Sequence, residues 1–395
     1  MNRISRIILL AAALLTGSLA ATASSKGQEI LDRVKKEMAP DSRQAVFELK
    51  IDKQRGRTAV LTGVTSDSAA LRAATAALDA AGIRYHNEAT VYPSDRMGLI
   101  RIPVASLRTR GAHAGEMATQ AVMGTPVRIL DNTGDWWRVQ TPDGYIAWVP
   151  DSSVAPKTAE EMDAWRSNDR RMTVGSLWQT RAYSSPTAGG PRDVVTDLVL
   201  GAIVEADTTL APIGSRIAIV LPDGRRAWAD AADLTAIEAW ADQPFDAVKI
   251  LDTAYSLEGS PYLWGGTSVK SVDCSGLAKV SYLNNGIILR RDASQQALTG
   301  QRLEADAWPE YQPGDLMFFG NRECHPCGHL RPRRPLHPLV GPRKAQQRRS
   351  RIARLSLQPA PLRAHPRHGR HRRHHARHRP PLVFQQKVNI CNPRP

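Results

Sequence analysis

Only one of the four cysteines, Cys274, precedes residue 321, and it stands in "SVDCSGLAKVSYL". The apolar spacing there predicts a helix from Ser275 to about Leu283, with Asp273 as its N-cap. Unpaired N–H groups and the helix dipole at a helix N-terminus favour a thiolate, the nucleophilic form of cysteine. Covalent catalysis by Cys274 is therefore one interpretation. The alternative is an inert, buried thiol at the start of an apolar helix.

A cysteine nucleophile needs a base, and the histidines are placed poorly for that role. Of the 11 histidines only His86 and His113 precede residue 321, so none follows the cysteine before that point. The next two, His325 and His329, stand in "ECHPCGHLRPRRP", where prolines remove N–H groups that a strand needs. The C-x-x-C in this stretch suggests zinc, but it lacks a second ligand pair at suitable spacing. The sequence therefore calls for no metal and no cofactor.

The elements around the cysteine follow a recognisable order. A helix is predicted over Phe245–Leu257, and Gly259 and Pro261 end it before the loop "YLWGG". The motifs "GSPYLWGGTSVKSVDCSGL", "RDASQQ" and "QPGDLMFFG" together resemble the NlpC-type cysteine peptidases of bacterial cell walls, from about Phe245 to Gly320. The resemblance implies a papain-like α+β fold, in which the helix with the cysteine packs against an antiparallel sheet.

The resemblance also implies roles for single residues. Cys274 is the expected nucleophile, with a histidine on a later strand as base and a further polar residue, commonly a second histidine, to orient it. The expected reaction is hydrolysis of the bond between the γ-carboxyl of D-glutamate and the diamino acid in murein stem peptides. Asp273 and Ser275 fall where the family helps to bind the peptide's free amine. Trp264 and Ser294 fall where it lines the substrate groove.

An internal repeat precedes this region. "TPDGYIAWVPDSSV" at 141–154 is echoed by "LPDGRRAWADAADL" at 221–234, and Asp-Gly in each copy is a hairpin signal. Short strands at close spacing predict two small β-barrels, at 96–155 and 174–237. They resemble bacterial SH3-like domains, most clearly in "GDWWRVQTPDGYIAWV". "EEMDAWRSNDRRM" predicts a charged linker helix within 156–173.

The first barrel contains residues that suit a ligand. Trp136, Trp137 and Trp148 suit ligand binding or the barrel core. In related peptidases the first SH3-like domain forms a wall of the site and admits peptides with a free N-terminal L-alanine. Glu116 and Tyr145 are the candidates for that role, since a carboxylate and a phenol suit an ammonium group. For either residue a plain surface position is the alternative.

The N-terminus has the form of a secretory signal. "MNRISRIILLAAALLTGSLAATASS" has early arginines, a short apolar run and small residues, which predicts a signal peptide over 1–23. An uncleaved membrane anchor is the alternative, although the run is short for a bilayer. Residues 27–95 then predict a small α/β module without recognisable chemistry. We expect export to the periplasm or exterior, in association with the cell wall.

The chain changes character after Gly320. Residues 321–395 carry 19 Lys and Arg against one acid, Glu323, so this stretch has a charge of +18 and the rest of the chain −3. Shifting the frame by one base lets "HPCGHLR" read Ile-His-Val-Gly-Ile-Tyr-Val, and "RRPLHPLVGP" read Asp-Gly-Arg-Phe-Ile-His-Ser-Ser-Gly. These are the strands in which the family carries its two histidines. We interpret 321–395 as a frameshifted, disordered tail, with nucleic-acid or acidic-polymer binding as an alternative.

Two functions remain open from the sequence. One is a murein cysteine peptidase, with residues 240–320 as the first half of its catalytic domain and with the chain as written inactive. The other is a non-catalytic wall-binding protein that uses its SH3-like pair and basic tail. Cys274 in its full motif favours the peptidase, because a binding protein needs no nucleophile. The expected partner is murein, with no nucleic acid and no stable membrane anchor.

Overall fold

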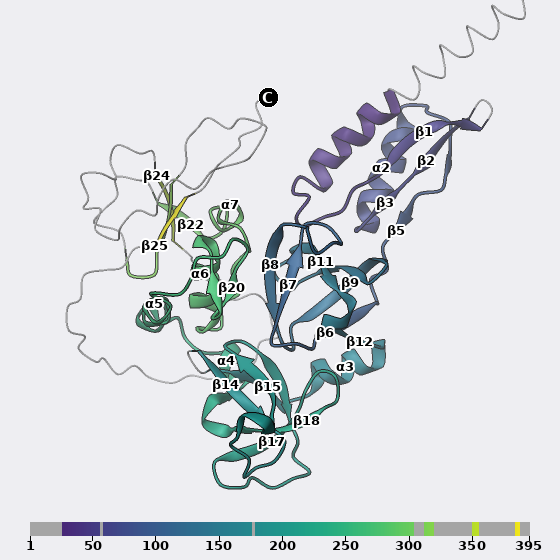
Figure 1. Ribbon diagram of the computed structural model, residues 1–395. Helices are drawn as coiled ribbons and strands as arrows, with labels where there is room; N and C mark the ends of the chain where they lie inside the picture. Colours follow the sequence, from purple (N-terminus) through teal and green to yellow (C-terminus); the bar gives the residue numbers. More distant parts are fainter. Residues whose placement is uncertain are drawn as a thin grey trace, which may run out of the picture. The chain divides into compact units, whose positions relative to one another are not determined.

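The computed structural model describes residues 26–55, 58–175, 178–303, 312–319, 350–354 and 384–387. Figure 1 shows its helices and strands, coloured along the sequence. The chain divides into two units. Unit 1 contains residues 1–100, 107–116 and 125–167, and unit 2 contains residues 101–106, 117–124 and 168–395. The predicted signal peptide, 1–23, lies outside the described residues. Within the described ranges, no helix is long and apolar enough to cross a membrane.

Unit 1 begins with a small α/β module. Its helices are residues 26–38 and α2 (Ser68–Ala80), which Asp67 caps by accepting a hydrogen bond from Ala69 N–H at 2.8 Å. Its strands are β1 (Lys50–Arg55), β2 (Thr58–Thr62), β3 (Val64–Thr65), β4 (Tyr85–Asn87) and β5 (Thr90–Val91). β2 pairs antiparallel with β1 and parallel with β4, and β3 pairs with β5. Helices and strands share one hydrophobic core.

The first barrel forms because short strands alternate buried and exposed side chains. Its strands are β6 (Met97–Ile100), β7 (Val104–Arg108), β8 (Met117–Val122), β9 (Pro126–Thr133), β10 (Trp136–Gln140), β11 (Ile146–Pro150) and β12 (Val154–Lys157). Unit 1 holds the order β12-β6-β9-β10-β11, while β8 belongs to unit 2. β10 and β11 form the hairpin that Asp143-Gly144 predicted, and Gly144 has a φ of +84°.

A helix and a second barrel follow. α3 (Ala159–Ser167) lies within the predicted linker and buries Met162 and Trp165. The second barrel contains β13 (Arg171–Val174), β14 (Gln179–Tyr183), β15 (Val194–Val199), β16 (Ile203–Ala206), β17 (Arg216–Val220), β18 (Arg226–Asp230) and β19 (Leu234–Ala236). Its strand order is β15-β14-β18-β17-β16-β13-β19. Gly224, in the second Asp-Gly turn between β17 and β18, also has a φ of +84°.

The last region is a mixture of helices and sheet. Its helices are α4 (Ile237–Ala241), α5 (Ala247–Ser256), α6 (Cys274–Leu283) and α7 (Ala293–Gln296). Its strands before residue 320 are β20 (Thr267–Ser268), β21 (Ser271–Val272), β22 (Gln301–Leu303) and β23 (Leu316–Phe319). Ile250 of α5, Tyr282 of α6 and Phe318 of β23 are buried in one core. The α+β class with two SH3-like barrels is thus confirmed.

Two stretches of the predicted disordered tail form strands. β24 (Ser350–Arg354) pairs antiparallel with β22 and β23, and β25 (Phe384–Lys387) pairs parallel with β23. At these two stretches β22 and β23, which would otherwise be edge strands, have partners for their backbone N–H and C=O groups. The disordered character of 321–395 as a whole stays a prediction. This pairing does not bear on the reading frame.

Candidate active site

Cys274 is the first residue of α6, half-buried and not in a disulfide. The N-cap predicted from the sequence is confirmed, because Asp273 Oδ1 accepts a hydrogen bond from Gly276 N–H at 2.7 Å. The helix begins one residue before the predicted start and ends at the predicted Leu283. The thiol thus lies in the first helical turn, where backbone N–H groups are unpaired.

The carboxylate of Asp273 is buried and heavily hydrogen-bonded. Its Oδ2 lies 2.6 Å from Nη2 of Arg291 and accepts from Gly265 N–H at 3.0 Å. Its Oδ1 accepts from Arg291 Nη1 at 3.3 Å and from Ser275 Oγ at 3.1 Å. Asp273 therefore ties the start of α6 to the "YLWGG" loop. The loop and the residue next to Cys274 are therefore held by the same carboxylate.

Three glycines allow the backbone to approach closely at this point. A Cβ on Gly265 would meet the carbonyl oxygen of Met117 at 2.5 Å, and one on Gly276 would overlap the carbonyl oxygen of Gly266. Gly266 O also accepts from Asp273 N–H at 3.1 Å. The loop therefore lies between α6 on one side and strand β8 on the other. No other residue type fits at Gly276 without moving the loop.

Tyr262 is a site residue that the sequence reasoning missed. Its side chain is hydrogen-bonded to the side chain of Cys274. Partial desolvation of the phenol, whose ring is otherwise largely exposed, raises the pKa of Tyr262 to about 12 together with the charges of Cys274 and Asp273, so the phenol keeps its proton at neutral pH. Only Trp264 was singled out in "YLWGG", and nothing in the sequence distinguished the tyrosine, because its contact depends on the bridge between Tyr262 and Val272.

The prediction of a favoured thiolate is wrong for the described structure. Burial is the largest cause that raises the pKa of Cys274, and the negative charge of Asp273 raises it further. The Ser275 N–H and Arg291 lower that pKa but do not outweigh the other two. Desolvation opposes the charged form of any acid, and the helix N-terminus alone does not compensate for it here.

Strand β8 holds the hairpin that precedes Cys274. The Oε1 atom of Gln120 accepts from Thr267 N–H at 3.0 Å and from Ser268 Oγ at 2.9 Å. Thr267 Oγ1 in turn accepts from Gln120 N–H at 3.0 Å. Val122 packs with Val269 and Val272 in a common core. A segment distant in the sequence thereby fixes β20 and β21.

Comparison with known proteins identifies two regions. The NlpC/P60 family profile matches residues 259–329, and that of the bacterial dipeptidyl-peptidase SH3 domain matches residues 107–154. This chain carries an NlpC/P60 domain. The first match contains Cys274 and the loop just described.

Curated relatives carry related names. A gamma-D-glutamyl-L-lysine dipeptidyl-peptidase of Bacillus cereus is 29% identical over 218 residues, which cover 53% of this chain and 62% of the relative. Dipeptidyl-peptidase 6 of Lysinibacillus sphaericus is 41% identical over 70 residues, 18% of this chain and 25% of the relative. The probable endopeptidase NlpC of Escherichia coli is 39% identical over 69 residues, 17% of this chain and 43% of the relative. The chain thus spans less than two thirds of the length of these relatives.

A solved structure of an NlpC/P60 family protein from Bacillus cereus is similar to this chain. Its sequence is 21% identical, the TM-score is 0.48, and the similarity covers 57% of this chain and 83% of that one.

The other predicted site residues of the NlpC/P60 domain are Ser275, Ser294 and Trp264, which all belong to the same unit as Cys274. Ser275 is buried, and its Oγ accepts from Arg291 Nη1 at 2.8 Å. Ser294 is half-buried in α7, whose Gln296 donates from Nε2 to the carbonyl of Ser275 at 3.2 Å. Trp264 is 60% exposed. Their roles in substrate binding stay predictions.

Glu116 and Tyr145 lie in unit 1, outside the unit that contains Cys274. Glu116 is exposed, and its carbonyl accepts from Thr109 N–H at 2.9 Å. Tyr145 is buried at the hairpin before β11. The structure thus describes both residues within unit 1. Their expected role in binding a substrate amine stays a prediction.

The three tryptophans of the first barrel differ in burial. Trp136 is buried and makes an edge contact with His113 at 5.1 Å between ring centroids. Trp137 and Trp148 are half-buried, and the guanidinium of Arg138 lies 5.9 Å from the Trp148 ring centroid. Trp136 therefore takes the core role that the sequence left open.

The described part of unit 2 contains no histidine. His86 and His113, which precede the NlpC/P60 domain, belong to unit 1. The tail residues His325 and His329, and the cysteines considered for zinc, lie outside the described residues. Within the described ranges Cys274 therefore has Tyr262 and Asp273 beside it, and no imidazole in its unit.

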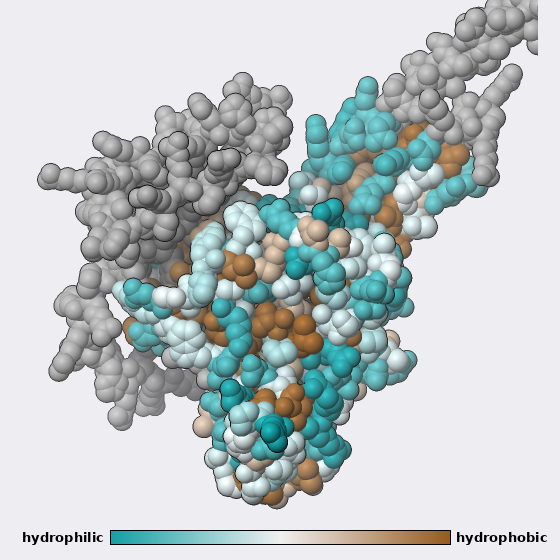
Figure 2. All heavy atoms as spheres, in the orientation of Figure 1, coloured by the Kyte–Doolittle hydropathy of each residue, from teal (hydrophilic) through white to brown (hydrophobic). Residues whose placement is uncertain are grey.

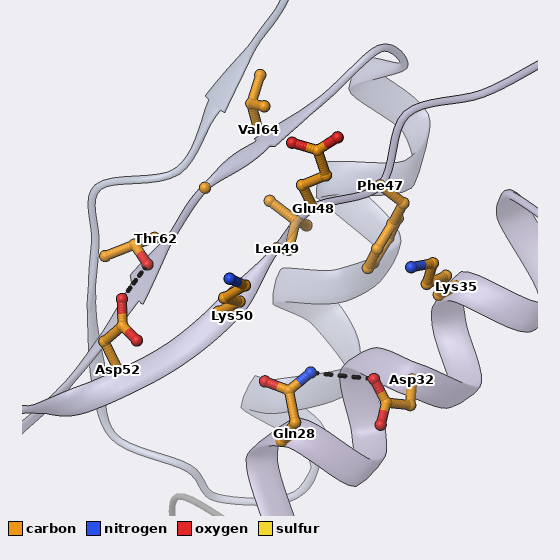
Figure 3. Close-up of a pocket in the computed structure, with 11 residues that line it drawn as sticks. Gln28, Asp32, Lys35, Phe47, Glu48, Leu49, Lys50, Asp52, Thr62 and Val64 are labelled. Carbon is orange, nitrogen blue, oxygen red and sulfur yellow. Dashed lines mark hydrogen bonds between the residues drawn. The ribbon is translucent and has the colours of Figure 1, made fainter. Parts of the chain in front are cut away.

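The N-terminal module contains a groove of about 510 Å³ (Figure 3). Asp32, Glu48 and Asp52 line it together with Lys35 and Lys50. Two of these carboxylates already accept hydrogen bonds from neighbouring side chains, at 3.0 Å and 2.6 Å. No cysteine, histidine or serine lines the groove. It adds no chemistry to that of Cys274.

Proposed function

We propose that this protein is a murein peptidase that uses Cys274 to hydrolyse γ-D-glutamyl-diamino acid bonds in stem peptides. The observation that carries the proposal is the position of Cys274, at the start of α6 and hydrogen-bonded to Tyr262 within the NlpC/P60 match. The names of the Bacillus cereus and Escherichia coli relatives support the class of reaction. Murein lies outside the cytoplasm, so we propose export and association with the cell wall.

The chemistry needs a proton to move twice. The thiolate of Cys274 attacks the amide carbonyl carbon, and the C–N bond to the diamino acid breaks as its nitrogen takes up a proton. Water then hydrolyses the thioester and frees the glutamyl carboxylate. A base must first accept the thiol proton, and an acid must then protonate the leaving nitrogen, steps that contribute about 10²–10⁴-fold. Since the pKa of Cys274 is raised, little thiolate forms without such a base.

We propose that the chain as written lacks this base because its reading frame shifts near residue 321. The family match ends at residue 329, eight residues past this point, which agrees with that position. The alternative frame restores two histidines at the family's spacing. The chain as written is then a catalytically impaired copy of a working peptidase.

The test compares the chain as written with a version whose frame is corrected by one base. Both are assayed on an L-Ala-γ-D-Glu-diamino acid peptide, each with and without Cys274→Ala. We expect turnover from the corrected chain only, abolished by Cys274→Ala while the fold is retained. Equal activity from the uncorrected chain would refute the frameshift, and activity that survives Cys274→Ala would refute the nucleophile. Binding to murein without any turnover by the corrected chain would instead favour a wall-binding protein.

A further inference from the structure

Arg291 is the largest fully buried side chain in the described part of the protein that carries a charge. It lies directly before α7, in "RDASQQ", and only 2% of its side chain is exposed. A buried guanidinium is costly unless it is paired and hydrogen-bonded. The partners of Arg291 therefore indicate what the residue is buried for.

Those partners are the two residues that flank the nucleophile. Arg291 donates from Nη2 to Asp273 Oδ2 at 2.6 Å and from Nη1 to Ser275 Oγ at 2.8 Å. The distance from Nη1 to Asp273 Oδ1 is 3.3 Å, so one fork engages both carboxylate oxygens. A weaker ion pair joins Arg291 to Asp292 at 3.8 Å. Asp273 directly precedes Cys274 and Ser275 directly follows it. Arg291 therefore binds the side chains on both sides of the residue that carries the thiol.

We propose that Arg291 is a positioning residue for Cys274, which it serves by orienting Asp273 and Ser275 and by balancing the carboxylate charge next to the thiol. The proposal rests on Cys274 as the reactive residue. A merely structural ion pair would leave the protonation of the thiol unchanged. If Arg291 positions Cys274, the protonation of the thiol must depend on the charge of Arg291. A lysine at this position keeps the charge but loses the fork.

The charges around the thiol support this role. The groups that act on Cys274 are Asp273 at its helix cap, Arg291 before α7 and Tyr262 in the loop. Asp273 raises the pKa of Cys274, and Arg291 lowers it. Removing Arg291 alone therefore leaves the carboxylate unbalanced beside the thiol. Removing both charges restores the balance.

The experiment measures the pH dependence of Cys274 alkylation by iodoacetamide in the full chain as written. Mass spectrometry of the peptide with Cys274 separates it from Cys324, Cys327 and Cys391. Arg291→Met should raise the apparent pKa of Cys274 and so slow its alkylation about tenfold at pH values below that pKa. Arg290→Met removes a neighbouring charge from an exposed side chain and is the matched control. It should leave the alkylation profile unchanged.

Two further variants keep the test decisive if Arg291→Met does not fold, which circular dichroism reveals. Arg291→Lys should give a smaller upward shift. The double variant Asp273→Asn with Arg291→Met retains a capping side chain and no charge, and should return the profile close to that of the wild type. A wild-type profile for both Arg291→Met and Arg291→Lys, or a double variant shifted as far as Arg291→Met, would overturn the proposal. Because no substrate is involved, a failure of the peptidase assay leaves this result intact.

Discussion

The two halves of the NlpC/P60 domain differ in how their polar groups are satisfied. In the half that contains Cys274, α6 and the loop before it are joined by Asp273, whose partners all lie between Gly265 and Arg291. In the sheet half, β22 and β23 pair with β24 and β25, from residues 350–354 and 384–387. The start of α6 is specified by residues close to it in the sequence. The sheet depends on strands far along the chain, so the proposed frameshift would alter the sheet and leave the start of α6 unchanged.

The largest effect is expected from Asp273, whose pair with Arg291 holds the half that contains Cys274. Asp273→Ala leaves the buried Arg291 without its main partner, and breaking such a pair costs about 3–5 kcal/mol. We expect faster hydrogen exchange of the α6 amides, measured by mass spectrometry. Asp292→Ala is the control. Its ion pair with Arg291 is longer, and its side chain takes part in the capping box of α7, so its loss of about 0.5–2 kcal/mol should fall on α7 and not on the α6 amides. Equal effects of the two changes would contradict the central role of Asp273.

The second prediction cuts the link between the two halves. The fully buried Tyr282 of α6 donates from its hydroxyl to the carbonyl of Gly314, just before β23. Tyr282→Phe removes this bond and leaves Gly314 O without that donor, at a cost of about 1–3 kcal/mol. The melting temperature measures the loss. The exposed Tyr255→Phe should leave it nearly unchanged.

The same tyrosine sets a pH dependence. Burial raises the pKa of Tyr282 above its usual value, so the folded state favours the neutral phenol. Its contribution to stability is complete below the ordinary tyrosine pKa of about 10 and is lost as the pH rises above it. Melting curves between pH 8 and about 11 should show a steeper alkaline fall for the wild type than for Tyr282→Phe. If the melting temperature fell equally with rising pH in the wild type and in Tyr282→Phe, Tyr282 would not be the cause of the alkaline fall.

The third prediction concerns the hydrogen bonds between Gln120 of β8 and the hairpin that precedes Cys274. Gln120→Leu removes the acceptor for Thr267 N–H and Ser268 Oγ, at a cost of about 1–2 kcal/mol, and should speed hydrogen exchange in residues 267–272. Gln120→Glu keeps the acceptor and should preserve protection. Gln179 bonds Lys270 of the same hairpin from an exposed position, so Gln179→Leu is the control. If Gln179→Leu sped hydrogen exchange in residues 267–272 as much as Gln120→Leu, the protection of these residues would not depend specifically on β8.

The smallest effect is expected from unit 1. In the frame-corrected protein, Glu116→Ala with Tyr145→Phe should slow cleavage of peptides with a free amine a few-fold, below about 1.4 kcal/mol of transition-state stabilisation. Acetylation of the amine should produce a similar loss in the wild type and little further loss in the variant. Equal wild-type rates on acetylated and free peptides would remove the amine from recognition.

The sequence predicted what is encoded locally. The cap and length of α6 followed from Asp273 and apolar spacing, and the barrels from repeated Asp-Gly turns that β10–β11 and β17–β18 now form. The contact of Tyr262 with Cys274 and the pairing of Arg291 with Asp273 were missed, because both join residues whose proximity is set by tertiary packing. The direction of the Cys274 pKa was wrong for the same reason, since burial is a property of the fold.

The surface of unit 2 presents several apolar side chains to solvent, and the face drawn in Figure 2 includes such patches. Tyr262, Leu263 and Trp264 are among them, with exposed fractions of 64%, 42% and 60%. The opposite side of their loop is closed, where Gly266 lies against Gly276 and Gly265 against Met117, backbone to backbone. The loop therefore combines a backbone that has no room to move toward α6 or β8 with three large side chains that stay accessible to solvent.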